Sequence, residues 1–212
     1  GCELGVDVVD LVVGTSDLAN SLGVSIRYTA VLPIGGQNLT KDLAIGLLTS
    51  QTDAEKIKVQ HGIARTELVH GHQMVEVPSV GDRPPRQFTR RDIAEILEPR
   101  VEEMFDLVKR EIVRAGYEGM LGAGVVITGG TSLLEGMPDA AERGLNLPAR
   151  RGVPTGIGGL RDIVSNPMHA TGVGLLLHAR QHADNLEAAG MRHGKGLGKV
   201  FDRMRSWMFD FF

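Results

Sequence analysis

The sequence is poor in cysteine, in aromatic residues and in long apolar runs. Cys2 is the only cysteine in 212 residues, which excludes an internal disulfide framework and fits a reducing compartment. Because no apolar run reaches about 18 residues, we expect no membrane-spanning helix, and we expect no signal peptide from the first residues. The formal net charge of −3 lacks the basic excess typical of nucleic-acid-binding proteins, so no nucleic-acid partner is expected.

The apolar pattern of the chain predicts a mixed α/β domain. Residues 6–13, "VDVVDLVV", are typical of a buried strand, and two short strands are expected around a turn near residues 20–23. Helices are predicted over 38–50, 52–62, 89–116 and 168–184, and a further strand over 124–128. The order of strands and helices therefore indicates one α/β body with a small insertion.

The helix starts can be predicted from their capping residues. Asn38 or Thr40 is expected to cap the first helix, whose apolar side would hold Leu39, Leu43, Ile45 and Leu47. Thr52 or Asp53 is expected to cap the second helix. Pro99 lies inside the third predicted helix and is expected to kink it.

Two strand-then-glycine turns are the candidate sites for chemistry. "DLVVGTSD" (10–17) offers backbone N–H groups and hydroxyls to phosphate oxygens, although an ordinary hairpin turn has the same pattern. "VVITGGTSLLEG" (125–136) predicts a helix that starts at a glycine turn and suits an anion, although from the residues alone a tight β–α turn is the favoured interpretation. Neither the dinucleotide fingerprint nor a Walker A sequence is present.

The two turns taken together resemble the second half of the actin/Hsp70/hexokinase fold. The segments "RYTAVLPIGGQNLTKDLA", "TDAEKIKVQHGIA", "VEVPSVGDRPPR" and "IAEILEPRVEEM" narrow this to a resemblance to the bacterial cell-division family FtsA, over roughly residues 5–178. The resemblance implies an α/β, actin-like (ribonuclease H-like) subdomain 2A over 1–47 and 91–180. It also implies an inserted subdomain 2B over 48–90 and an N-terminal half that is missing from this chain.

The resemblance implies a nucleotide site for ATP with Mg²⁺ in the intact family member. Its residues in this sequence would be those of the second phosphate loop, the ribose region, the 2B helix and the adenosine loop. In that order they are Gly14, Thr15, Ser16, Gly36, Gln37, Glu55, Lys58, Gly129, Gly130 and Thr131. Without the resemblance, Glu55 and Lys58 would be read as a solvated helix face.

The phosphate loop departs from the family pattern Asp-x-Gly-Gly-Gly-Thr-Thr-Asp. Val12 and Val13 replace two glycines, and β-branched residues resist positive φ and add bulk. We therefore expect this chain alone to bind ATP weakly or not at all. This weighs against the alternative function of an ATPase of the sugar-kinase or Hsp70 class. A third alternative, a chaperone fragment, would need a substrate-binding β domain after the ATPase, whereas the chain is predicted to end in a linker and a short helix. No catalytic residues are assigned, and His178 and His182 lack a third metal ligand.

The resemblance also implies partners. An FtsA-type scaffold tethers the tubulin-like FtsZ to the cytoplasmic face of the inner membrane at the division site, and self-associates into filaments when intact. An arginine cluster is a candidate dock for the acidic and apolar C-terminal peptide of FtsZ, with a solvated loop as the open alternative. The cluster consists of Arg83, Arg86, Arg90 and Arg91.

The chain ends in "KVFDRMRSWMFDFF", which holds five of its aromatic residues: the whole sequence has only one Trp, two Tyr and six Phe. Residues 181–196 are predicted to be a flexible linker and 197–212 an amphipathic helix. Its apolar stripe comprises Leu197, Val200, Phe201, Met204, Trp207, Met208 and Phe211. Basic side chains on the other face favour an anionic membrane surface, which the resemblance supports over a helix docked on protein.

Overall fold

The structure is a computed structural model that describes residues 5–22, 25–81, 83–155 and 164–188. The chain divides into two units, residues 1–171 and 172–212. The first unit holds a sheet, its helices and a small hairpin. The described part of the second unit belongs to a single helix, α6 (Ala170–Ala188), so residues 181–188 of the predicted linker are helical.

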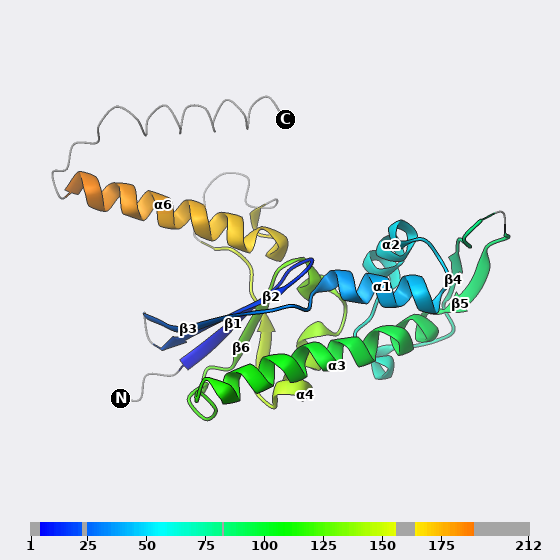
Figure 1. Cartoon of the computed structure of the whole chain (residues 1–212), viewed down its shortest axis with the longest axis horizontal. Coiled ribbons are helices and arrows are strands. Elements are labelled where there is room, and N and C mark those ends of the chain that lie inside the picture. The colour runs from blue at the N-terminus through cyan, green and yellow to red at the C-terminus, as the bar shows by residue number, and fades with distance from the viewer. Residues whose placement is uncertain (1–4, 23–24, 82, 156–163, 189–212) are drawn as a thin grey trace. The chain divides into compact units, whose positions relative to one another are not determined.

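The first unit contains a five-stranded sheet in the order β3-β2-β1-β6-β7, of which β1, β2, β3 and β6 are labelled in Figure 1. Its strands are β1 (Gly5–Leu11), β2 (Ser16–Leu22), β3 (Ser25–Leu32), β6 (Val125–Thr128) and β7 (Ala149–Arg151). The first three strands form an antiparallel meander, whereas β6 and β7 run parallel to β1. The parallel β1–β6 pair brings the two glycine turns to the same end of the sheet.

Four α-helices and a two-stranded hairpin complete the described part of this unit. The helices are α1 (Gly36–Gly46), α2 (Gln51–His61), α3 (Arg90–Arg114) and α4 (Met137–Leu145), and the hairpin pairs β4 (Met74–Val77) with β5 (Arg86–Thr89). Single 3₁₀ turns η1, η2 and η3 lie at Thr66–Leu68, Gly130–Leu133 and Pro167–His169. Helix α3 packs against both α1 and α4 (Figure 1). The small hairpin follows α2 and is not part of the main sheet.

The long helix α3 supplies the centre of the core. Apolar residues that share one face of this helix are buried, among them Ile93, Leu97, Met104 and Phe105. Pro99 does not interrupt α3, which is one continuous helix. Pro99 lies on the exposed side, so water can satisfy the carbonyl group that its missing N–H leaves free.

Both predicted helix caps are wrong. Helix α1 is capped by Gly35, and Asn38 acts from inside the helix by accepting a 3.0 Å hydrogen bond from the Gly35 N–H. Helix α2 is capped by Ser50, whose hydroxyl accepts from the Asp53 N–H at 3.1 Å. Each helix begins one or two residues earlier than predicted. In α1 the cap comes from Asn38 at the third helical position, and in α2 it comes from Ser50 rather than from Thr52 or Asp53.

The apolar side of α1 is narrower than predicted. Leu39, Leu43 and Leu47 are fully buried, but Ile45 is 72% exposed. Ile45 lies two residues from both Leu43 and Leu47, a spacing that places it on the other side of a helix. The expectation that it faces the core is therefore wrong.

A buried carboxyl group lies within the sheet. Asp7 and Asn20 are directly opposite each other on β1 and β2, and both side chains are almost inaccessible. The Asn20 amide donates to Asp7 Oδ1 at 2.8 Å, while Asp7 Oδ2 and Asn20 Oδ1 have no partner among the described atoms. Burial raises the pKa of Asp7, and the Asn20 hydrogen bond offsets only part of that effect.

Replacement of Asp7 by Asn tests the charge of this pair. A raised folded-state pKa means that the neutral acid stabilises the fold below the ordinary pKa of 3.8, and that this stabilisation is lost as the pH rises through the raised value. Asp7→Asn stays neutral and can donate to Asn20 Oδ1. We expect it to be about 1 kcal/mol more stable than the wild type at pH 7 and nearly equal near pH 4, by denaturant unfolding.

The exposed Asp106→Asn serves as the control for this measurement, and its effect should be small at both pH values. A loss of stability in Asp7→Asn of the same size at both pH values would mean that the pKa of Asp7 is not raised in the folded chain.

Candidate functional site

A groove of about 910 Å³ lies where the β1–β2 turn, the start of α1, helix α2 and the η2 segment meet. Six of the predicted nucleotide-site residues line it. They are Gly36, Gln37, Glu55, Lys58, Gly130 and Thr131. Segments that are distant in the sequence and were predicted to form one site therefore line the same groove.

The β1–β2 turn is held tightly against the start of α1. The Val12 N–H donates to Thr15 O at 3.1 Å and closes the turn. The carbonyl groups of Val12 and Val13 accept from the first two amides of α1, Gly36 N–H at 2.9 Å and Gln37 N–H at 2.7 Å. These amides would otherwise lack partners, so the turn caps the helix.

Gly35 makes this close approach possible. A Cβ atom at residue 35 would lie 2.6 Å from Val12 O and 2.7 Å from Thr15 N. Both neighbours are backbone atoms that cannot move aside without disturbing the sheet or the cap. The turn and α1 therefore form one tightly connected unit, for which a glycine is required.

The predicted backbone strain at the two valines is wrong. Among the described residues that are not glycine, positive φ angles occur only at Leu48 and Asn146. The turn is closed by the Val12–Thr15 bond without left-handed residues, so its valines meet no conformational penalty. Their bulk is still relevant because both line the groove, where Val13 is 72% exposed.

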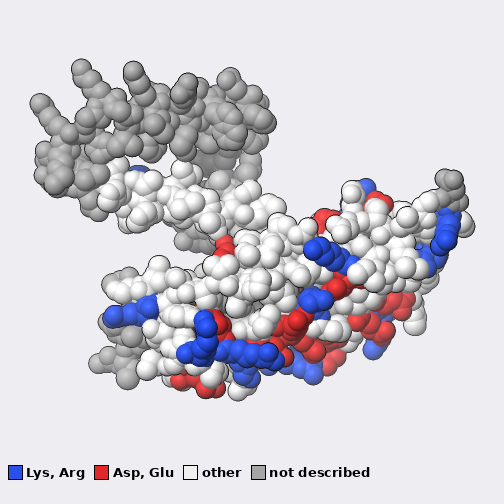
Figure 2. Space-filling model, viewed as in Figure 1, with Lys and Arg blue, Asp and Glu red and all other residues white. Residues whose placement is uncertain are grey.

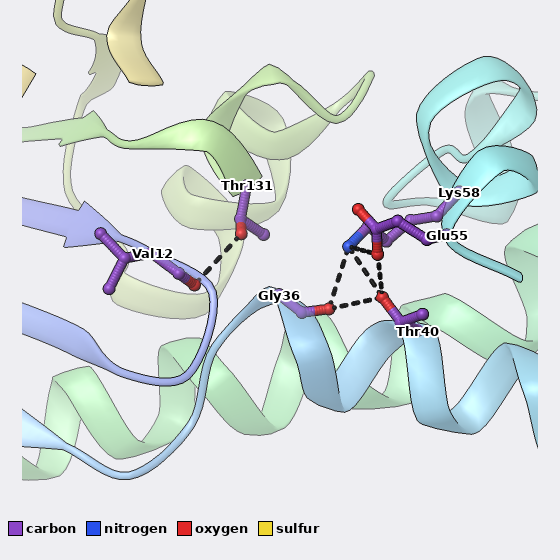
Figure 3. Close-up of polar contacts among 6 residues, drawn as sticks. All are labelled: Val12, Gly36, Thr40, Glu55, Lys58 and Thr131. Carbon is purple, nitrogen blue, oxygen red and sulfur yellow. Dashed lines mark hydrogen bonds and ion pairs between the residues drawn. The ribbon is translucent and has the colours of Figure 1, made fainter. Parts of the chain in front are cut away.

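The second glycine turn touches the first one. Gly129 has a φ of +82°, and a Cβ there would lie 2.5 Å from Leu11 O, so only glycine fits. Beside it, Thr131 Oγ1 donates to Val12 O at 3.4 Å (Figure 3). The helix predicted to start here is instead the 3₁₀ turn η2, and α4 begins only at Met137.

Lys58 links α2 to the first turn of α1 (Figure 3). Its side chain is only 11% exposed. The ammonium group donates to Gly36 O at 3.1 Å, to Thr40 Oγ1 at 2.9 Å and to Glu55 Oε2 at 2.7 Å. An ammonium group has three N–H donors, so these three acceptors use all of them. Lys58 therefore positions the wall of the groove.

Glu55 is the acidic member of the same network. The Thr40 hydroxyl and Lys58 both donate to its Oε2 atom. Burial by itself would raise the pKa of Glu55, but these hydrogen bonds outweigh it and the pKa is lowered from its ordinary value. The side chain is half exposed and lines the groove, so Glu55 presents a carboxylate to it at neutral pH.

The remaining predicted phosphate-loop residues lie behind the groove surface or beside it. Ser16 is buried, and its hydroxyl donates to Ile34 O at 2.7 Å. Gly14 is in the turn, and a Cβ atom added there would have no heavy-atom neighbour within 4 Å. The N–H groups of Val13, Gly14 and Thr15 make no backbone hydrogen bond within the described part of the chain. Of these three residues, only Val13 lines the groove.

The four predicted arginines do not form one cluster. Arg83 and Arg86 line a second groove of about 470 Å³. Arg90 instead lines the first groove, where it donates to His61 O at 3.0 Å and pairs with Glu135, and Arg91 pairs with Glu95. The sequence prediction failed because α3 begins at Arg90, and its first turn separates these side chains from the hairpin.

The second groove lies between the end of α1 and the loop that joins β4 to β5, where basic side chains lie over the hairpin (Figure 2). It is lined by Ala44, Leu48, Thr49, Ser79, Val80, Arg83, Pro84 and Arg86. Two contacts hold its walls together: Arg86 donates to Leu47 O, and the Thr49 hydroxyl donates to Pro78 O at 2.6 Å. Sequence reasoning identified its arginines but missed the apolar lining.

The predicted membrane residues Val200, Phe201, Met204, Trp207, Met208 and Phe211 lie outside the described residues. Among the described helices, none is long and apolar enough to cross a membrane. The described residues also contain no group of three or more potential metal ligands from His, Cys, Asp and Glu. The rings of His178 and His182 stack 6.4 Å apart on α6.

Comparison with solved structures identifies the fold of the chain. The chain is similar to MreB5 of Spiroplasma citri bound to ADP, with a TM-score of 0.68 and 17% identity, over 87% of this chain and 56% of that one. It is also similar to the MamK double helical filament, with a TM-score of 0.58 and 15% identity, over 78% and 54% of the two chains. The fold is therefore actin-like, as predicted.

The family follows from the sequence comparisons. The family model "Cell division protein FtsA" matches residues 5–174, and the chain belongs to this family. It is 42% identical to cell division protein FtsA of Pseudomonas aeruginosa and 40% identical to that of Escherichia coli strain K12. Each match covers 97% of this chain and 51% of the relative, so the chain spans about half the length of these curated relatives. The predicted family is confirmed.

Proposed function

We propose that this chain is part of a cell-division scaffold of the FtsA type that binds FtsZ and is attached to a membrane. The observation that carries the proposal is the second groove, which combines an apolar lining with two arginines in a chain of this family. An extended peptide with apolar and acidic side chains fits such a surface. The C-terminal peptide of FtsZ has this character, and residues 48–90 would act as subdomain 2B.

Charge reversal at Arg83 tests this dock. Within the part of the chain that the structure describes, Arg83 has no hydrogen-bond or ion-pair partner, whereas Arg86 holds Leu47 O. We expect Arg83→Glu to weaken binding of an FtsZ C-terminal peptide about fivefold at low salt, with a smaller effect at high salt, by fluorescence anisotropy.

Arg91→Glu is the matched control for charge, because Arg91 is exposed and does not line the groove. Equal affinities of the wild type and Arg83→Glu at low salt would exclude this groove as the dock. A wild type that does not bind the peptide would exclude the proposed function.

We also propose that the first groove belongs to a nucleotide site for ATP with Mg²⁺ in the intact protein. Three features support it: the Val13 N–H group at the groove, which makes no backbone hydrogen bond, the carboxylate of Glu55, and similar folds solved with ADP and AMPPNP. Asp10 and Asp17 are opposite each other on β1 and β2, and Asp10 Oδ1 is buried without a partner. These two carboxylates would hold the Mg²⁺ ion.

The valines of the β1–β2 turn should limit nucleotide affinity through their bulk. We expect weak or undetectable ATP binding by this chain in calorimetry, and at least about tenfold tighter binding by a Val12→Gly/Val13→Gly variant. Val59→Ala, which changes a groove residue on α2, should have little effect. Micromolar ATP binding by the wild type, or no gain in the double variant, would contradict this role of the valines.

The membrane attachment is proposed from the C-terminal sequence. Residues 197–212 would lie in the interface of an anionic membrane, attached by a linker that ends at residue 196. The protein would then act at the cytoplasmic face of the inner membrane at the division site. In the intact protein, self-association into filaments would add many weak anchors together.

Trp207→Glu tests the anchor. A charge on the apolar stripe opposes insertion, so we expect at least about tenfold weaker co-sedimentation with anionic liposomes. Ser206→Glu adds the same charge on the polar face and should weaken binding much less. If both variants sediment as the wild type does, the tail is not a membrane anchor.

A further inference from the structure

Leu48 has an unfavourable backbone conformation at the end of α1. Its φ is +51°, in the left-handed region that L-residues other than Gly, Asn and Asp rarely adopt. The helix ends with two hydrogen bonds, from Leu48 N–H to Ile45 O at 3.2 Å and from Thr49 N–H to Ala44 O at 3.0 Å. In this helix-ending motif, the residue in the left-handed conformation is usually glycine, because a side chain there is costly.

The other left-handed residue that is not glycine provides a comparison. Asn146 ends α4 with a φ of 55°. Asparagine is the side chain that tolerates this conformation best after glycine. The left-handed conformation is thus adopted by a suitable residue, Asn146, at the end of α4 and by an unsuitable residue, Leu48, at the end of α1.

Packing within the described chain does not compensate for the leucine. The Leu48 side chain is 58% exposed, whereas the preceding Leu47 is fully buried and belongs to the core. An exposed leucine in a strained position contributes little to folding. Strained residues that persist in this way are often found at functional sites.

The position of Leu48 suggests what it does. It lines the second groove together with Val80, which is also exposed, and with Pro84. The charges of Arg83 and Arg86 lie in the wall of the same groove. An apolar side chain beside unpaired positive charge matches a peptide that carries an apolar residue next to carboxylates.

We propose that Leu48 is the apolar anchor of this docking groove, retained for binding at the expense of the fold. The inference rests on the proposed FtsZ dock and adds the residue that determines its affinity. A carboxylate-bearing peptide would contact Arg83 with its charge and cover Leu48 with an apolar side chain. The motif that ends α1 would thereby present Leu48 to the partner.

The proposal predicts opposite effects on stability and on binding. Leu48→Asn places in α1 the residue that α4 already uses, so its melting temperature should be equal to the wild type or about 2–4 °C higher. The affinity for a synthetic FtsZ C-terminal peptide should fall about tenfold, because the apolar contact is lost. Leu48→Met keeps an apolar side chain and should retain the affinity within about twofold.

Two controls separate this effect from general ones. Asn146→Gly relaxes the left-handed position of α4 and should leave peptide affinity unchanged, as should Val113→Ala, which removes exposed apolar surface outside the groove. Wild-type affinity in Leu48→Asn, or a lower melting temperature for it, would overturn the role of Leu48. Loss of binding in Arg83→Glu with unchanged binding in Leu48→Asn would leave the dock in place and reject the anchor.

Discussion

Both candidate sites depend on one constraint, which is that helix α1 is held in position by hydrogen bonds at both of its ends. At its start, two carbonyl groups of the β1–β2 turn cap the helix, and Gly35 permits the contact. At its end, Arg86 and Thr49 tie it to the hairpin region, while Leu39 and Leu43 fix its buried side. Because one helix forms a wall of the first groove and a wall of the second groove, displacement of α1 would disturb both.

Much of the fold could be predicted because its signals are repeated along the chain. The apolar spacing of α3 recurs from Ile93 to Ile112, so one exposed proline does not hide it. The meeting of the two glycine turns was expected from the family resemblance, and the parallel pairing of β1 with β6 produces it. Helix caps were predicted less well, since each depends on one or two hydrogen bonds. Gly35 has no side chain by which a cap could be recognised in the sequence. Ser50 is followed by Thr52 and Asp53, which are equally suitable capping residues.

The geometry of the two candidate sites could not be predicted, because it depends on tertiary contacts that a local sequence pattern does not contain. The turn with Val12 was predicted to be strained, but its backbone avoids the left-handed region and finds its partners in α1. Arg90 was grouped with Arg83 by proximity in sequence, whereas the start of α3 turns it toward Glu135. Leu48 had no sequence signal, because its importance lies in a φ angle and an exposed side chain.

We propose that the groove at the end of α1 is the partner dock of this FtsA-family chain. Backbone amide NMR of the labelled chain, titrated with unlabelled FtsZ C-terminal peptide, tests it most directly. We predict that the largest shift changes fall within residues 44–49 and 79–86, which contribute the groove lining. Changes centred on residues 12–15 and 129–131 at the first groove, or no saturable changes at all, would contradict the claim.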